Sequence, residues 1–321
     1  MAATTFQSLA EEIEDVAGLE DYLRELLPTL ARRTGRPVVL YAGRGEDSPP
    51  RSTPFPSGED LWVLSDLIEP PEGDQLDLIV ESQGGQVEAV EQMVTYLRQN
   101  YRHLRCFVPH LAAGAATLLV LAADEIWLDD RGALGPLDST IPLSRQSSAG
   151  AVTVEYVAAS HILQGFERAR ETLRAEGQAS LPAYASLLER YDLHLFEQCH
   201  QSLELGRELL RVWLKEYMFR DLPAREASLP IRRIGDRLGK PSEFISSRRP
   251  LGLEALRDVG LKVVDTRSQG DLRELIWTLY CATALLFERQ PEVYKVYANH
   301  RQLLYYRGSR RSSRRAELAM I

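Results

Sequence analysis

The chain has 321 residues, of which 44% are hydrophobic and 26% are charged, and these ordinary values exclude a mainly disordered, collagenous or low-complexity protein. The length predicts about two domains, or one large α/β unit with extensions. Acidic side chains outnumber basic ones, 46 to 38, and the net charge of -8 gives no support to nucleic-acid binding.

Targeting and redox features predict a cytoplasmic protein. Residues 1–16 are polar and acidic and lack the basic start and apolar run of a signal peptide. The longest apolar stretch, residues 111–123, is too short for a bilayer that needs about 20 residues. The cysteines Cys106, Cys199 and Cys281 form no CxxC pair, so they predict buried thiols in a reducing compartment and no zinc site.

The N-terminal part is predicted to be helical before the chain enters a sheet. Apolar residues at helical spacing predict a helix over residues 6–33. A short β-rich run predicts a buried strand at 38–41. The Gly-, Pro- and Ser-rich residues 43–58 indicate a loop, and residues 59–67 a short helix.

The most informative pattern follows, because strands and helices alternate along it. The predicted order is strand 76–80, helix 87–100, strand 106–109, helix 112–122 and strand 126–128. Strands separated by helices of this length are typical of βαβ units with a parallel sheet. The fold class is therefore predicted to be α/β.

The rest of the chain is predicted to be mainly helical. The Gly-, Pro- and Ser-rich residues 131–150 indicate an irregular segment. The elements expected after it are helices at 152–175, 181–217, 222–238 and 271–288 and a late strand at 261–264. The aromatic residues from Tyr294 to Tyr306 either close the helical part or dock on a neighbouring subunit, and the Arg-rich residues 307–315 predict a disordered tail.

Two small-residue features stand out in the alternating part. Gly84 and Gly85 lie between a predicted strand and helix, where backbone N–H groups can point at an anion or a developing oxyanion. A helix of small residues begins near Gly114 and Ala115. Each feature alone is more typical of a turn or of a tightly packed core helix than of a site.

Together the two features resemble a known family. The order strand, Gly84-Gly85, helix, strand, alanine-rich helix, strand and Leu134-Gly135-Pro136-Leu137-Asp138 resembles the serine dehydrogenase proteinase family, a branch of the ClpP/crotonase fold related to signal peptide peptidase A. The similarity covers roughly residues 36–265. The organisation that it implies is an N-terminal helical extension (1–35), a ClpP/crotonase-like core of βαβ units (36–150), a mainly helical region that completes the core and makes oligomer contacts (151–306), and a basic tail (307–321).

The resemblance places the family's catalytic serine at Gly114. Family members carry a Ser-Ala-Ala/Gly-Thr motif on this helix, and the matching residues 114–117 read Gly-Ala-Ala-Thr. A glycine has no side chain with which to attack a carbonyl. The family's oxyanion turn carries over to Gly84 and Gly85, and Ala115 joins them as an expected oxyanion- or peptide-binding residue.

The general base of the family also lacks a match. The resemblance implies either a Ser-Lys dyad or a Ser-His-Asp triad. In the region of the dyad lysine the sequence has Arg168 and Arg170, and arginine stays protonated and is a poor base. In the region of the triad histidine it has Asp138 and no histidine, and His161 further on is interpreted as a helix-surface or core residue.

We therefore predict a degenerate serine-protease-family protein that binds a peptide or protein without catalysis. Two alternatives stay open: a serine peptidase inactivated at position 114, and a crotonase-type acyl-binding enzyme that would use Glu81 or Glu88. The hydroxyls of Thr117 and Ser82 are interpreted as structural. No cofactor or metal ion is expected, and neither a membrane nor a nucleic acid is an expected partner. Relatives of this fold assemble through helical extensions, so we expect a homo-oligomer, in which an active paralogue is a further option.

Overall fold

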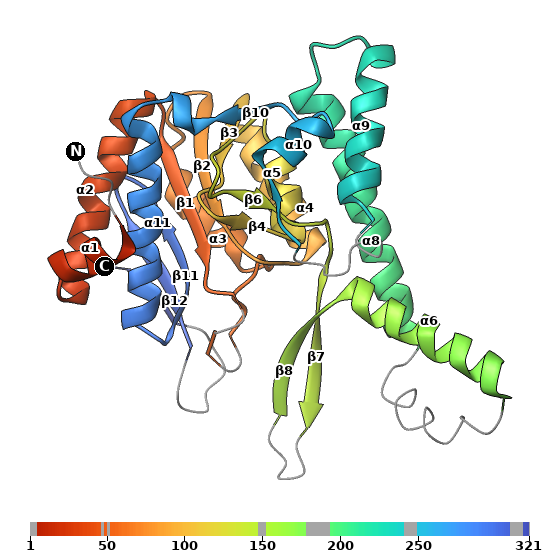
Figure 1. Cartoon of the computed structure of the whole chain (residues 1–321). Helices are drawn as coiled ribbons and strands as arrows, with labels where there is room; N and C mark the ends of the chain where they lie inside the picture. The colour runs from red at the N-terminus through yellow and green to blue at the C-terminus, as the bar shows by residue number, and fades with distance from the viewer. Residues whose placement is uncertain are drawn as a thin grey trace.

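The centre of the molecule is a mixed sheet that combines distant parts of the chain (Figure 1). The computed structural model describes residues 5–45, 48–49, 52–146, 152–177, 193–240, 249–308 and 317–320. Within these ranges one sheet has eight strands in the order β10-β5-β3-β2-β1-β11-β12-β13. Their bounds are β1 Val38–Gly43, β2 Gln75–Glu81, β3 His103–Phe107, β5 Glu125–Leu128, β10 Val263–Asp265, β11 Val293–Ala298, β12 Leu303–Arg307 and β13 Glu317–Met320. Strands β10 to β1 pair in parallel and β11 to β13 antiparallel, so the predicted α/β class is confirmed.

The sheet is covered by helices on both faces, because side chains alternate along its strands. In β1, Val39 and Tyr41 face one apolar cluster, whereas Leu40 and Ala42 face the other. The helices against the first cluster are α3 (Asp60–Ile68), α4 (Val87–Asn100) and α5 (Ala115–Leu121). The helices against the second are α1 (Phe6–Glu12), α2 (Val16–Thr34) and α11 (Asp271–Arg289).

Among the remaining elements, one hairpin and one helix project away from the sheet (Figure 1). The projecting elements are the hairpin β7 (Thr140–Gln146) with β8 (Val152–Ala158) and the helix α6 (Ala159–Glu176). The others are β4 (Leu111–Ala112), β6 (Ala133–Leu134), α8 (Leu193–Trp213), a π-helical turn (Leu214–Met218), α9 (Ala224–Leu238), β9 (Leu251–Gly252), α10 (Leu253–Asp258) and a 3-10 turn (Thr266–Ser268). Strands β4, β6 and β9 form a small second sheet that contacts the end of β2.

Several boundaries differ from the sequence prediction. The expected helix over 6–33 is split, because Asp15 caps a new helix by accepting a hydrogen bond from the Gly18 N–H at 2.7 Å. The alanine-rich helix begins only after Gly114, since residues 111–112 pair as β4. Most of the predicted helix 181–217 matches α8, but its residues 181–192 lie outside the described ranges.

Two predictions for the second half were wrong. Residues 131–150 are not wholly irregular, because they contain β6 and β7, and residues 152–158 are a strand instead of the start of a helix. Val152, Val154 and Val157 are β-branched and favour the strand. The aromatic segment from Tyr294 to Tyr306 contains β11 and β12, which extend the main sheet next to β1. Of the predicted disordered tail, residues 309–316 lie outside the described ranges.

A buried ion pair joins the added strand β11 to helix α3. The Lys295 side chain is 2% exposed, and its Nζ lies 2.7 Å from Asp60 Oδ1 and 2.8 Å from Oδ2. The Ser57 hydroxyl lies 3.2 Å from the same Nζ, and the Ser57 N–H donates to Asp60 Oδ2 at 2.7 Å. A buried charge that keeps its partner is tolerated, whereas one that loses its partner is costly.

We predict that replacing one member of this pair destabilises the fold strongly. Lys295→Met leaves the Asp60 carboxylate buried without its cation and should lower the free energy of unfolding by about 3–5 kcal/mol. The double variant with Asp60→Leu should lose less than either single variant, because no charge is then stranded. Urea unfolding measures this, with the exposed pair Arg170–Glu167 as a control whose loss changes little. Equal stability of wild type and Lys295→Met would contradict it.

Candidate functional site

The candidate site lies where the carboxyl end of β2 meets the start of α5. Gly84 and Gly85 connect β2 to α4, and Gly114 is the residue directly before α5. Residue Ser82 links the two, because it forms an isolated parallel bridge with Ala112. Loops at the carboxyl ends of parallel strands are the usual position of ligand sites in such sheets.

Gly114 is held in a conformation and a space that only glycine fits well. Its φ is +59° and its ψ is -132°, which is the left-handed side of the backbone map. A Cβ atom at this position would lie 3.1 Å from the Cα of Gly84 and 3.1 Å from the carbonyl oxygen of Asp138. The Gly114 N–H donates to the Pro136 carbonyl at 3.0 Å. The fold therefore brings Gly84, Gly114 and Asp138 into direct contact.

Two backbone amides beside this contact have no acceptor among the described residues. Among the described residues, neither the Gly84 N–H nor the Ala115 N–H donates a hydrogen bond, although both residues are buried. The Gly85 amide is different, because it donates to the Thr140 hydroxyl at 3.1 Å. The Gly85 carbonyl accepts from the Thr140 N–H at 2.8 Å. Gly84 and Ala115 thus have donors left for a ligand, whereas Gly85 fixes the base of the hairpin.

Asp138 is bound through its carboxylate by Ser139 and by Ser160 at the start of α6. Its buried carboxylate accepts from the Ser139 N–H at 2.9 Å, the Ser160 N–H at 3.2 Å and the Ser160 hydroxyl at 2.5 Å. Burial raises the pKa of Asp138, while the bonds from Ser160 lower it. The Ser202 hydroxyl on α8 donates to the Ser139 hydroxyl at 2.7 Å. This network anchors the start of α6.

The other residues considered from the sequence are occupied elsewhere. Arg168 and Arg170 are exposed on α6, which leads away from the sheet, and Arg170 pairs with Glu167 (Figure 1). His161 is exposed on the first turn of the same helix, and its charge acts on the Asp138 carboxyl, whose pKa it lowers. The buried Thr117 hydroxyl donates to the Ala112 and Gly135 carbonyls, both at 2.9 Å, which is the structural role expected for it.

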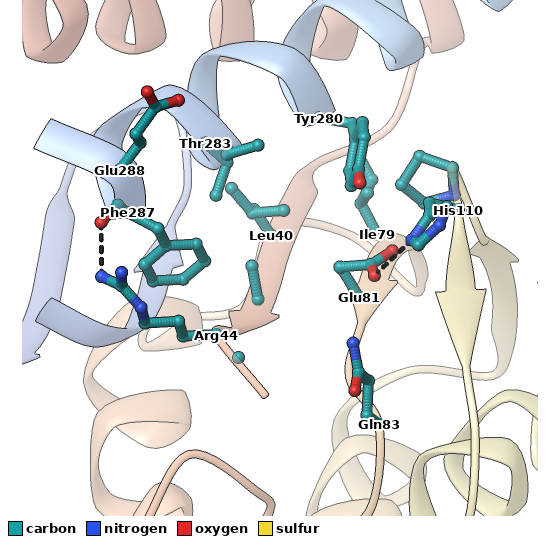
Figure 2. A pocket seen from close by; sticks show the side chains of 14 residues that line it. Leu40, Arg44, Ile79, Glu81, Gln83, His110, Tyr280, Thr283, Phe287 and Glu288 are labelled. Atoms are coloured by element: carbon teal, nitrogen blue, oxygen red, sulfur yellow. Dashed lines mark hydrogen bonds and ion pairs between the residues drawn. The ribbon is translucent and has the colours of Figure 1, made fainter. Parts of the chain in front are cut away.

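The sequence reasoning missed a second polar cluster on the opposite face of the sheet. Glu81, which was weighed only for acyl chemistry, pairs with His110 at 3.0 Å in a cavity of about 280 Å³ beneath α11 (Figure 2). The available signal was positional. Glu81 ends β2 and His110 follows β3, so both lie at the carboxyl edge of adjacent parallel strands.

Metal and membrane features were also sought in the structure. Among the described residues, no group of three or more His, Cys, Asp or Glu side chains could hold a metal ion. In the parts of the chain that the structure describes, no helix is both long and apolar enough to cross a membrane. Cys106, Cys199 and Cys281 are free and buried. Burial raises their thiol pKa, to about 12 for Cys106, so none is a ready nucleophile.

The geometry around Gly114 falls within the part of the chain that resembles known proteins. Residues 59–158 match the ClpP-like SDH-type serine proteinases. The matched range contains Gly84, Gly85, Gly114, Ala115 and Asp138, so the resemblance drawn from the sequence is confirmed at family level.

Two curated archaeal proteins are similar to part of the chain. An uncharacterized protein of Methanocaldococcus jannaschii is 37% identical over 76 residues, which is 24% of this chain and 27% of that protein. A second uncharacterized protein of this organism is 34% identical over 79 residues, which is 25% of this chain and 27% of that protein. The match thus spans about a quarter of the length of these relatives. No solved structure matches the chain significantly.

We predict that a side chain at position 114 destabilises the protein. Gly114→Ala should lower the free energy of unfolding by about 1–3 kcal/mol, because alanine is strained at this φ and its Cβ presses on backbone atoms. Gly165→Ala on α6 is the matched control, since its Cβ meets nothing within 4 Å, and it should be neutral or stabilise by up to about 1 kcal/mol. Denaturant unfolding compares the two variants. Equal stability would show that the backbone around position 114 has room for a Cβ atom.

Proposed function

We propose that this chain is a non-catalytic member of the serine proteinase family that binds an extended peptide segment beside Gly114. One observation carries the proposal. Position 114 has no side chain, and a Cβ there would lie 3.1 Å from both the Gly84 Cα and the Asp138 carbonyl oxygen, so these neighbours would have to give by a few tenths of an ångström. The glycine is therefore integral to the local packing, which favours a scaffold over a peptidase that has lost its serine by a single change.

The candidate bases named from the sequence also favour a non-catalytic role. A serine hydroxyl needs a base within about 3 Å to remove its proton. Arg168 and Arg170 are exposed on α6, and the Asp138 carboxylate is engaged by Ser139 and Ser160. Catalysis at this place would need both a nucleophile and a base.

The donors that support peptide binding are the backbone amides of Gly84 and Ala115. In a peptidase such donors stabilise the oxyanion, but they also bind the ground-state carbonyl oxygen of a peptide. An N–H group that is buried without an acceptor is costly, so a ligand carbonyl at this place is favourable. The occupant that fits these donors is an extended peptide with its backbone carbonyl beside Gly114. The expected homo-oligomer, with or without an active paralogue, stays a prediction.

Peptide binding without cleavage is the test of this function. Fluorescein-labelled casein peptides should raise their fluorescence polarisation with the wild-type chain, and mass spectrometry should recover them intact. Gly114→Leu places a bulky side chain against Gly84 and should abolish binding, whereas Gly165→Ala should bind as wild type does. Circular dichroism checks that both variants are folded.

The outcomes that contradict the proposal are distinct. Cleavage of the peptides by the wild-type chain would restore the peptidase alternative. Absence of binding, or unchanged binding in a folded Gly114→Leu variant, would show that no peptide binds beside Gly114.

A further inference from the structure

A cavity of about 280 Å³ opens between the sheet and helix α11, on the face away from the Gly114 contact (Figure 2). Its volume is close to that of small-molecule pockets. Charged residues follow three adjacent strands here: Arg44 after β1, Glu81 at the end of β2 and His110 after β3. Because these strands are parallel, their carboxyl ends meet at one edge, where ligands of α/β sheets bind.

One end of the cavity holds an oriented histidine. Glu81 Oε1 lies 3.0 Å from His110 Nδ1, and Glu81 Oε2 accepts from the Leu111 N–H at 2.8 Å. The carboxylate therefore fixes the proton on Nδ1. The imidazole also packs on Tyr280, with ring centroids 5.3 Å apart and planes at 31°. Its Nε2 has no partner among the described residues and remains available for a ligand.

The other side of the cavity holds a guanidinium group (Figure 2). Arg44 Nη1 donates to the Phe287 carbonyl, and the Gln290 carbonyl lies 3.4 Å away, so the side chain is held against the end of α11. Its Nε and Nη2 engage no described residue. Glu81 pairs with His110, and the exposed Glu288 of α11 also lines the cavity. Among the described lining residues, Arg44 is the one arginine or lysine, so its free donors are the ones offered to an anionic group.

Apolar side chains separate the two polar groups. Leu40 and Ile79 from the sheet and Ala284 and Phe287 from α11 line the space between Arg44 and His110. A ligand that fits must therefore have a short apolar body with a polar group at each end. The anionic end belongs with Arg44, since a guanidinium binds carboxylates through paired N–H donors.

We propose that this cavity binds a small carboxylic acid, with its carboxylate on Arg44, its apolar body against Phe287, and a hydroxyl at its far end on His110 Nε2. The hydroxyl suits both forms of the ring: it donates to Nε2 of the neutral imidazole and accepts from Nε2–H of the imidazolium, which the Glu81 hydrogen bond favours by raising the pKa of His110. This site does not depend on the proposed function, since it uses the other face of the sheet and none of the residues around Gly114.

The test uses three matched probes and ligand-observed NMR with the full chain. 4-Hydroxyphenylacetate has the carboxylate, apolar ring and distal hydroxyl in the required order, and it should bind with a dissociation constant below about 1 mM. Phenylacetate lacks the hydroxyl, and 4-hydroxyphenylacetamide lacks the charge. Each should bind at least about tenfold more weakly, as expected for loss of one hydrogen bond to a charged or oriented group.

Variants locate the binding. Ala284→Phe fills the space between the polar groups and should abolish it, while Arg44→Gln and His110→Gln should each weaken it by about tenfold or more. Arg170→Gln on the exposed face of α6 is the charge-matched control and should leave affinity unchanged. Circular dichroism checks folding, because Arg44 also contacts the end of α11. Failure of 4-hydroxyphenylacetate to bind, equal binding of the amide, or binding that survives Ala284→Phe in the folded variant would overturn the proposal.

Discussion

The close approach of three backbone segments at Gly114 is the constraint on which the site depends. The end of β2, the start of α5 and the stem of the β7–β8 hairpin meet here, and a Cβ on residue 114 would lie 3.1 Å from both neighbours. The contact lets Thr140 pair with Gly85 and lets Asp138 reach Ser160. The same glycine that permits this packing removes the hydroxyl that a serine peptidase needs. Under the proposed function, the close packing and the absence of catalysis therefore have one cause.

The sheet offers two separate chemical environments at one edge. On the α5 face, unpaired backbone amides of Gly84 and Ala115 surround a position without a side chain. On the α11 face, the charged side chains of Arg44, Glu81 and His110 surround a cavity. Alternation along β2 separates them, because neighbouring residues of a strand point to opposite faces. A backbone-lined site suits a peptide, whereas a site lined by charged side chains suits a small molecule.

Local signals in the sequence predicted the part of the fold that carries the Gly114 contact. Helix α4 was placed at its observed bounds, since a strand, a Gly-Gly turn and a helix follow each other directly. The expectation that Gly84 lies beside Gly114 came from the family resemblance. The hairpin was missed because Val152, Val154 and Val157 fit both a strand and the start of the following helix. Strand β11 was missed because its partner β1 lies far away in sequence, and no local pattern indicates such a pairing. The Glu81–His110 pair had a positional signal at the ends of β2 and β3, but helix α11, which closes the cavity over it, lies far away in sequence.

Turnover by a serine-restored variant tests the central claim most directly. The account predicts that Gly114→Ser hydrolyses fluorogenic peptides no faster than the wild-type chain or the matched Gly114→Ala variant, because a serine hydroxyl needs a positioned base and the proposed function assigns none to position 114. All three proteins are compared at equal concentrations after circular dichroism has shown that they are folded. Steady turnover by Gly114→Ser alone would contradict the account, since it would show that a working base is present and that the chain is a peptidase inactivated at one residue.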